Sequence, residues 1–278
     1  MTNDTTGLLR KRLDLAEGLF RQCEHLAKDL GGVDFAPLAL FRHIMQMGDG
    51  IFILAKAMSS HPMVPLLRSM LECFFSLEYI LCKGKGESKD LEEHSKRSLS
   101  WLVFCINQEI ALKEMIDLTT SRGQAFKSEL REHSGSVATE LCSHLERKSG
   151  TYYSAQPLRD RLAEPDLVNL QEEYQKLKSK PGYFFQLVDP KIRRIEDLAR
   201  EIGRWERYKI FYKRFSHTVH GTAPLKLLEH KREGAVRFGE LRTTAEQAFL
   251  VGLAEAVLHG AGDTLVKHYR TQAEAFPG

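Results

Sequence analysis

The sequence predicts an all-α protein, and three observations support this prediction. Apolar residues recur at steps of three and four through most of the chain, which is the spacing of one helix face. No stretch sustains the apolar–polar alternation of a half-buried strand. The chain of 278 residues, with 42% hydrophobic and 28% charged residues, has the composition of a folded protein with an ample core.

The first three helices follow from the apolar pattern and its breaks. A first amphipathic helix is expected over 9–30, ending at Gly31-Gly32, and a second over 37–58. Pro62 suits the first turn of a third helix over 63–81. That third segment is apolar around so much of its circumference that we expect it in the middle of a bundle.

The remaining elements are expected to be mostly helical too. A turn over 83–86 precedes one long helix or two over 89–118, and a polar, solvated helix follows over 122–148. A loop over 149–157 leads to shorter helices over 167–177, 192–202 and 205–219. The segment 221–243 is rich in helix breakers and is expected to hold a small hairpin or another excursion, before a closing helix over 245–269.

We therefore expect a single all-helical domain over 1–278. Within it, 1–34 forms an N-terminal helix and 35–270 forms the bundle, interrupted by a polar helical insertion at about 119–182.

Several classes of protein are not expected. The best apolar run, 51–58, contains Lys56 and falls short of the roughly 20 residues that a bilayer requires, so no membrane association is expected. Arg10-Lys11-Arg12 leads into a charged stretch, unlike a signal peptide. The five cysteines show no Cys-x-x-Cys spacing, which is typical of free thiols in the cytoplasm, and no metal or other cofactor is expected.

Charge is distributed unevenly along the chain. The segment 191–242 contains fourteen Lys and Arg against seven Asp and Glu, a net charge of +7, so the rest carries −4 of the total of +3. Such an asymmetry is typical of a surface that binds an anionic partner such as RNA. The alternative is a solvated face laced with ion pairs, for example Glu196–Arg200.

One segment carries residues suited to chemistry on a phosphodiester. On a helix, Tyr212, Ser216 and His220 share a stripe, and Arg214 and His217 lie on a neighbouring arc that also includes His220. Histidine exchanges protons near neutral pH, and a guanidinium binds phosphate through paired hydrogen bonds. Gly221 would end the helix and leave His220 near the helix end, not buried in its middle.

A charged pair interrupts the apolar third helix. Arg68 and Glu72 are spaced i, i+4, and buried charges require partners. The pair either knits this helix to its neighbours as a structural ion pair, or faces the Tyr212–His220 stripe and orients it.

Together these residues resemble those of a known group. Arg68-x-x-x-Glu72 in an apolar helix, followed by Tyr212-x-x-x-Ser216-x-x-x-His220-Gly221, resembles an uncharacterised bacterial all-helical family allied to the HEPN superfamily. The resemblance implies a helical bundle and the Arg-x4–6-His motif of metal-independent ribonucleases, which Arg214 and His220 match. It also implies a homodimer and a place in a toxin–antitoxin or antiviral defence module. Phe215 departs from the pattern, which has a polar residue after the Arg; it points either to a side chain in the core, with His217 substituting, or to lost catalysis.

Three hypotheses follow for the function. The first is a cytoplasmic endoribonuclease that uses Arg214 and His220, with His217 as the alternative second acid–base group and Arg68 and Glu72 as positioning residues. The second is a non-catalytic module that binds RNA, a nucleotide or a partner protein from the same operon. The third treats the same polar residues as a structural knot within a helical oligomer.

Overall fold

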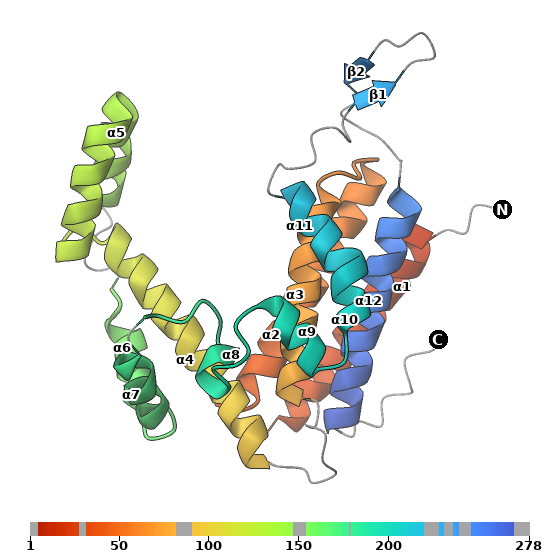
Figure 1. The fold of residues 1–278 in the computed structure, drawn as a ribbon, viewed down its shortest axis with the longest axis horizontal. Coiled ribbons are helices and arrows are strands. Elements are labelled where there is room, and N and C mark those ends of the chain that lie inside the picture. The colour runs from red at the N-terminus through yellow and green to blue at the C-terminus, as the bar shows by residue number, and fades with distance from the viewer. Residues whose placement is uncertain are drawn as a thin grey trace. The chain divides into compact units, whose positions relative to one another are not determined.

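The computed structural model describes residues 5–27, 32–81, 91–146, 154–177, 179–219, 228–230, 236–238 and 246–269. The chain divides into two compact units, one made of Met1–Ser98 with Ile192–Gly278 and the other of Leu99–Lys191. Helices make up nearly all of the described structure, which confirms the all-α class (Figure 1).

Four long helices form the body of the first unit: α1 (Thr5–Leu26), α2 (Phe35–Lys56), α3 (Met63–Leu81) and α12 (Gln247–Tyr269). α1 packs on α2 and α12, and α3 packs on both α2 and α12. The largest side chains of α3, among them Phe74 and Phe75, are fully buried. The expected central position of α3 is confirmed, because α3 also contacts the short helices that follow residue 194.

A second, shorter helical layer covers α3. It consists of α9 (Ile195–Glu201), α10 (Trp205–Arg207), the π-helical segment η1 (Tyr208–Tyr212) and α11 (Lys213–Val219). The last three form one continuous helical run, and η1, α9 and α11 all contact α3 (Figure 1). The carboxylate of Asp197 accepts hydrogen bonds from the backbone N–H groups of Arg193 and Arg194, which caps the start of α9.

A short antiparallel ribbon interrupts the helices of the first unit. β1 (Leu228–His230) pairs with β2 (Val236–Phe238), with Leu228 opposite Phe238. This is the small hairpin that the breaker-rich segment predicted.

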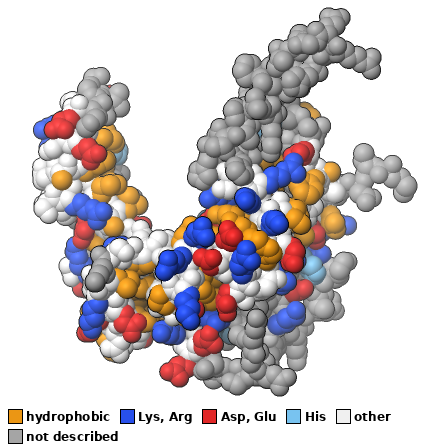
Figure 2. Space-filling model, in the orientation of Figure 1, with side chains coloured by type: hydrophobic (Ala, Val, Ile, Leu, Met, Phe, Trp, Pro, Cys, Tyr) orange, Lys and Arg blue, Asp and Glu red, His pale blue; other side chains and the backbone are white. Residues whose placement is uncertain are grey.

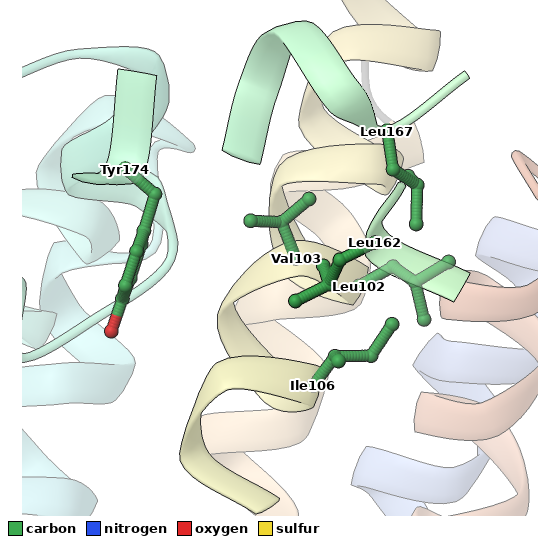
Figure 3. Close-up of a cluster of buried hydrophobic side chains, with 6 residues drawn as sticks. All are labelled: Leu102, Val103, Ile106, Leu162, Leu167 and Tyr174. Atoms are coloured by element: carbon green, nitrogen blue, oxygen red, sulfur yellow. The ribbon is translucent and has the colours of Figure 1, made fainter. Parts of the chain in front are cut away.

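The second unit has a core of its own. It contains most of α4 (Leu91–Ile116), together with α5 (Ser121–Glu146), α6 (Gln156–Leu162), α7 (Val168–Lys176) and α8 (Phe185–Val188). Its buried cluster consists of Leu102, Val103, Ile106, Leu162, Leu167 and Tyr174 (Figure 3). Asn107 donates a hydrogen bond to Gln171 at 2.6 Å, which links α4 to α7.

The structure differs from the sequence prediction at several boundaries. The second unit begins at Leu99, inside α4, rather than at about residue 119, because the apolar side chains of α4 beyond Ser98 pack on α6 and α7. α1 ends at Leu26, four residues early, and the short helices α6 and α8 were not predicted. The expected turn over 83–86, Gly31 and most of the loop over 149–157 lie outside the described residues.

Two helices of the first unit, α2 and α12, are long and apolar enough to cross a membrane by length and composition alone. In each, a large part of the apolar window, 44% and 50% respectively, is buried inside the protein. The core helix of a soluble protein passes the same test, so the finding is weak evidence for a membrane span. Of the five cysteines, four fall in the described residues, and none of these four forms a disulfide: Cys23, Cys73, Cys105 and Cys142.

Candidate functional site

Arg68, Glu72 and Tyr212 meet where α3 and η1 pack together. The Tyr212 hydroxyl donates a hydrogen bond to Glu72 Oε1 at 2.6 Å and accepts one from Arg68 Nη2 at 3.2 Å. Arg68 Nε also donates to the same Glu72 oxygen at 3.1 Å, closing a triangle that we call the Arg68 cluster. The structure therefore brings together three of the predicted site residues, from segments 140 positions apart in the chain.

The protonation of Tyr212 follows from its surroundings. Burial raises the pKa of the Tyr212 phenol, and the hydrogen bond to the Glu72 carboxylate raises it further. The phenol is therefore neutral at physiological pH and acts as a donor, not as a base. This arrangement makes Tyr212 a group that holds two charged side chains in place.

The Arg68 cluster is less buried than the apolar sequence of α3 suggested. The Arg68 side chain is 20% exposed and that of Glu72 is 36% exposed, so water reaches both charges. The deeply buried charge on α3 is Glu78, which is 3% exposed and which the sequence analysis did not single out. Arg204 binds its carboxylate with both Nε, at 2.8 Å to Oε2, and Nη2, at 2.5 Å to Oε1. A carboxylate inside the apolar run Leu77 to Leu81 was the available signal.

A stack of aromatic rings continues from the Arg68 cluster. The rings of Trp205 and Tyr208 lie 5.5 Å apart and those of Tyr208 and Tyr212 lie 5.2 Å apart, with interplanar angles of 15° and 23°. The guanidinium of Arg200 lies 3.5 Å from the centre of the Trp205 ring, and that of Arg68 lies 5.2 Å from the centre of the Tyr212 ring. We call these stacked rings the aromatic ladder. The rings stack within one helical run, and the contact of Arg68 with the Tyr212 ring joins the run to α3, as that of Arg200 with Trp205 joins it to α9.

Arg214 has a different position from that of the Arg68 cluster. Its side chain is 48% exposed, and its Nη2 donates to Glu246 Oε1 at 2.7 Å, just before α12. Tyr212 is buried, whereas Lys213 and Arg214 are exposed, so Arg214 lies on the outer side of the helical run. The predicted constellation is thus split, with Tyr212 on the inner side of the helical run and Arg214 on its surface.

The other predicted residues are described to different extents. Phe215 is 3% exposed, which confirms the expectation that its side chain lies in the core. Ser216 is half-buried on α11. His217 belongs to α11 by its backbone, whereas its side chain is not described, and His220 lies outside the described residues.

Beside Arg214, a second contact joins the helical run to α12. The rings of Phe211 and Phe249 lie 6.0 Å apart, and Phe249 is 44% exposed. Glu246, the partner of Arg214, has a backbone φ of 60°, in the left-handed region that a non-glycine residue rarely adopts. Sequence reasoning missed Glu246 and Phe249, since nothing in their local pattern distinguishes them.

The basic segment is partly neutralised within its described residues. Arg200 forms an ion pair with Glu196 at 3.3 Å, which is the pair expected for a solvated face with internal ion pairs. Arg204 and Arg214 also bind carboxylates. Figure 2 shows basic and acidic side chains intermixed on the described surface. Exposed Lys209 and Lys213 lie on the same helical run as Arg214. Within the described part of the chain, no group of three or more His, Cys, Asp or Glu is arranged to hold a metal ion.

The fold is thus a helical one in which the Arg68 cluster lies on the inner side of the helical run and the exposed Arg214–Glu246 pair lies on its surface. A family model for a family of unknown function (DUF5677) matches residues 34–234, and the chain belongs to that family. The match includes the Arg68 cluster and the helical run up to Val219. Comparisons with curated proteins and with solved structures find no match.

Proposed function

We propose that this protein is a metal-independent endoribonuclease of the HEPN type, acting in a bacterial defence or toxin–antitoxin module. The observation that supports the proposal best is the Arg68 cluster, because it anchors the base of the helix that carries Arg214 and His217. The contact of the Arg68 guanidinium with the Tyr212 ring and the buried Phe215 hold the same helix on its inner side. A preorganised helix of this kind keeps its outward groups in one position during a reaction.

In the proposed reaction, the 2′-hydroxyl of one nucleotide attacks the adjacent phosphorus, and the 5′-oxygen of the next nucleotide leaves. His220 accepts or returns the proton, with His217 as the second acid–base group, and the products are a 2′,3′-cyclic phosphate and a 5′-hydroxyl. Arg214 neutralises the charge of the phosphorane. Its pair with Glu246 is exposed and therefore weak, so a phosphate can displace the carboxylate at a cost below about 1 kcal/mol.

Arg68, Glu72 and Tyr212 serve as positioning residues in this proposal. Their hydrogen bonds are directed at one another, and the raised pKa of Tyr212 removes it from proton transfer. Their contribution is to fix where the segment after residue 212 begins. Ser216, half-buried on the same helix, lies one turn beyond Tyr212.

The observation that Arg214 already has a carboxylate partner favours a second candidate function. In that case the protein binds RNA, a nucleotide or a partner protein from the same operon without cleaving anything. Both candidates imply a cytoplasmic protein, and the first includes a homodimer that brings two copies of the site together.

The test is incubation of the purified protein with end-labelled RNA in EDTA. Cleavage to 2′,3′-cyclic phosphate ends is expected, His220→Ala should abolish it, and Arg214→Ala should slow it by about 10²–10³-fold. Arg21→Ala, which removes a 74% exposed arginine on α1, is the matched control and should leave the rate unchanged. Cleavage that survives His220→Ala, or that requires Mg²⁺, would contradict the proposal. RNA binding without cleavage would favour the second candidate.

A further inference from the structure

The surface beside Arg214 contains two contacts of different chemistry between the same two segments. The ring centres of Phe211 and Phe249 lie 6.0 Å apart, and Arg214 Nη2 donates a hydrogen bond to Glu246 Oε1 at 2.7 Å. Phe211 and Arg214 are three positions apart on the helical run, and Glu246 and Phe249 are three positions apart at the start of α12. Because both contacts join the same two short stretches of chain, an aromatic contact and a charged contact lie close together.

The outer groups of both contacts are accessible. Phe249 is 44% exposed, and the side chains of Arg214 and Glu246 are 48% and 58% exposed. Ile210, which precedes Phe211, is 58% exposed. The aromatic ladder, by comparison, has its rings stacked on one another or beneath arginines. Phe249 therefore offers a more exposed ring than the half-buried or buried rings of the ladder, three residues after the carboxylate that binds Arg214.

This juxtaposition matches the chemistry of a single-stranded nucleotide. Proteins that bind single strands combine cations along the phosphate backbone with aromatic rings on which unpaired bases stack. Here Arg214, with exposed Lys209 and Lys213 on the same run, supplies the cations, and Phe249 supplies the ring. A base held in a duplex cannot reach such a ring, so the arrangement selects unpaired RNA.

The backbone of Glu246 points to the same place. A left-handed conformation in a non-glycine residue costs on the order of 1 kcal/mol or more, and such residues cluster at ligand-binding sites. The strained residue carries the carboxylate that occupies Arg214. A phosphate that replaces this carboxylate at Arg214 leaves Glu246 free to turn away.

We infer that this surface is a subsite for single-stranded RNA, in which Arg214 binds a backbone phosphate in place of Glu246 and an adjoining unpaired base stacks on Phe249. The inference rests on the proposed function for its choice of RNA. It goes further by naming the strandedness of the substrate and the ring that reads it.

The test measures binding by fluorescence anisotropy with a 2′-O-methyl single-stranded RNA oligonucleotide, which cannot be cleaved through its 2′-hydroxyl. The single strand is expected to bind at least 10-fold more tightly than the same sequence as a duplex. Phe249→Ala should weaken single-strand binding about 10-fold, and Phe249→Trp should preserve it. Phe35→Ala, at the start of α2 and 42% exposed, is the matched control and should change nothing.

Further measurements keep the outcomes distinct. Arg214→Gln should weaken binding and make it less dependent on salt, by about 0.7 in the slope of log affinity against log salt per lost phosphate contact. Equal affinity for the duplex, or Phe249→Ala binding within two-fold of wild type, would overturn the inference, as would a Phe249→Ala protein that is folded by circular dichroism but changes its oligomeric mass instead. If the oligonucleotide binds as expected while natural RNA is not cleaved, the subsite stands and the nuclease proposal fails. If RNA is cleaved but the Phe249→Ala protein binds the oligonucleotide normally, the nuclease proposal stands and the subsite inference fails.

Discussion

Removing the hydroxyl of Tyr212 is the smallest change that breaks two of the three hydrogen bonds of the Arg68 cluster. Tyr212→Phe keeps the ring and its stacking on Tyr208 but removes the hydroxyl that donates a hydrogen bond to Glu72 and accepts one from Arg68. Hydrogen bonds to charged groups contribute about 1.5–3 kcal/mol each. The direct contact of Arg68 with Glu72 at 3.1 Å persists, and both side chains are reached by water, so we expect the low end of that range for the two bonds together, a loss of about 1.5 kcal/mol in the free energy of unfolding.

The assay is urea unfolding followed by tryptophan fluorescence. The chain has two tryptophans, and a Trp101→Phe background leaves Trp205, which lies in the same unit as the cluster and stacks on Tyr208. Tyr208→Phe is the matched control, because its hydroxyl donates to Glu196 only at a long 3.4 Å, and it should cost less than about 0.5 kcal/mol. A Tyr212→Phe protein within about 0.3 kcal/mol of wild type, or a Tyr208→Phe protein equally destabilised, would refute the reasoning.

Three further predictions concern stability. Glu78→Gln removes the buried charge that Arg204 neutralises, and it should lower the free energy of unfolding, measured with urea, by about 2–3 kcal/mol. Glu172→Gln, in a surface pair, should change it by less than about 0.5 kcal/mol, and equal effects of the two substitutions would contradict the buried position of Glu78. Burial, reinforced by the neighbouring His268, lowers the pKa of His94 to about 4. Because this lies below the value of about 6.5 in an unfolded chain, the unfolded state takes up the proton first, so the stabilisation is complete above about pH 6.5 and is lost as the pH falls towards 4. The urea midpoint should reveal a loss of about 2 kcal/mol at pH 4.5 that His94→Gln lacks, and an identical pH profile for both proteins would count against it. Gly260→Ala would place a methyl group 3.2 Å from the buried Phe74 ring of α3 and should destabilise the protein by about 1 kcal/mol. Gly18→Ala, with open space around it, should stabilise the protein by about 0.5–1 kcal/mol. The melting temperature should therefore fall in the first variant and rise in the second, and a shift of the same sign in both would exclude the close contact.

Much of the fold could be predicted because long helices leave strong local signals. α3 runs over Met63–Leu81 as predicted, since Pro62 marks its start and apolar residues continue along its length. The division into units could not be predicted in the same way. The sequence predicted one long helix or two over 89–118, and nothing in it marks Ser98 as a boundary. The residues of α4 up to Ser98 belong to one unit and the remainder to the other, which depends on partners distant in the chain.

The site was predictable only in part for a related reason. The i, i+4 spacing of Arg68 and Glu72 on an apolar helix is a local signal that a polar partner is needed, and Tyr212 supplies it. The partner of Arg214 could not be predicted, because Glu246 lies 32 positions away and has a backbone conformation that its residue type disfavours. A π-helical segment also shifts which side chains share a face, and the regular 3.6-residue period contains no information about it.

The proposed ribonuclease activity is tested most directly by the appearance of 2′,3′-cyclic phosphate ends on single-stranded RNA incubated with the purified protein in EDTA. Mass spectrometry of the products should show these ends with wild-type protein and with Arg21→Ala, at a rate lowered by about 10²–10³-fold in Arg214→Ala and undetectable in His220→Ala. Intact RNA after incubation with the folded wild-type protein, or the same cyclic ends from His220→Ala, would contradict the proposed ribonuclease.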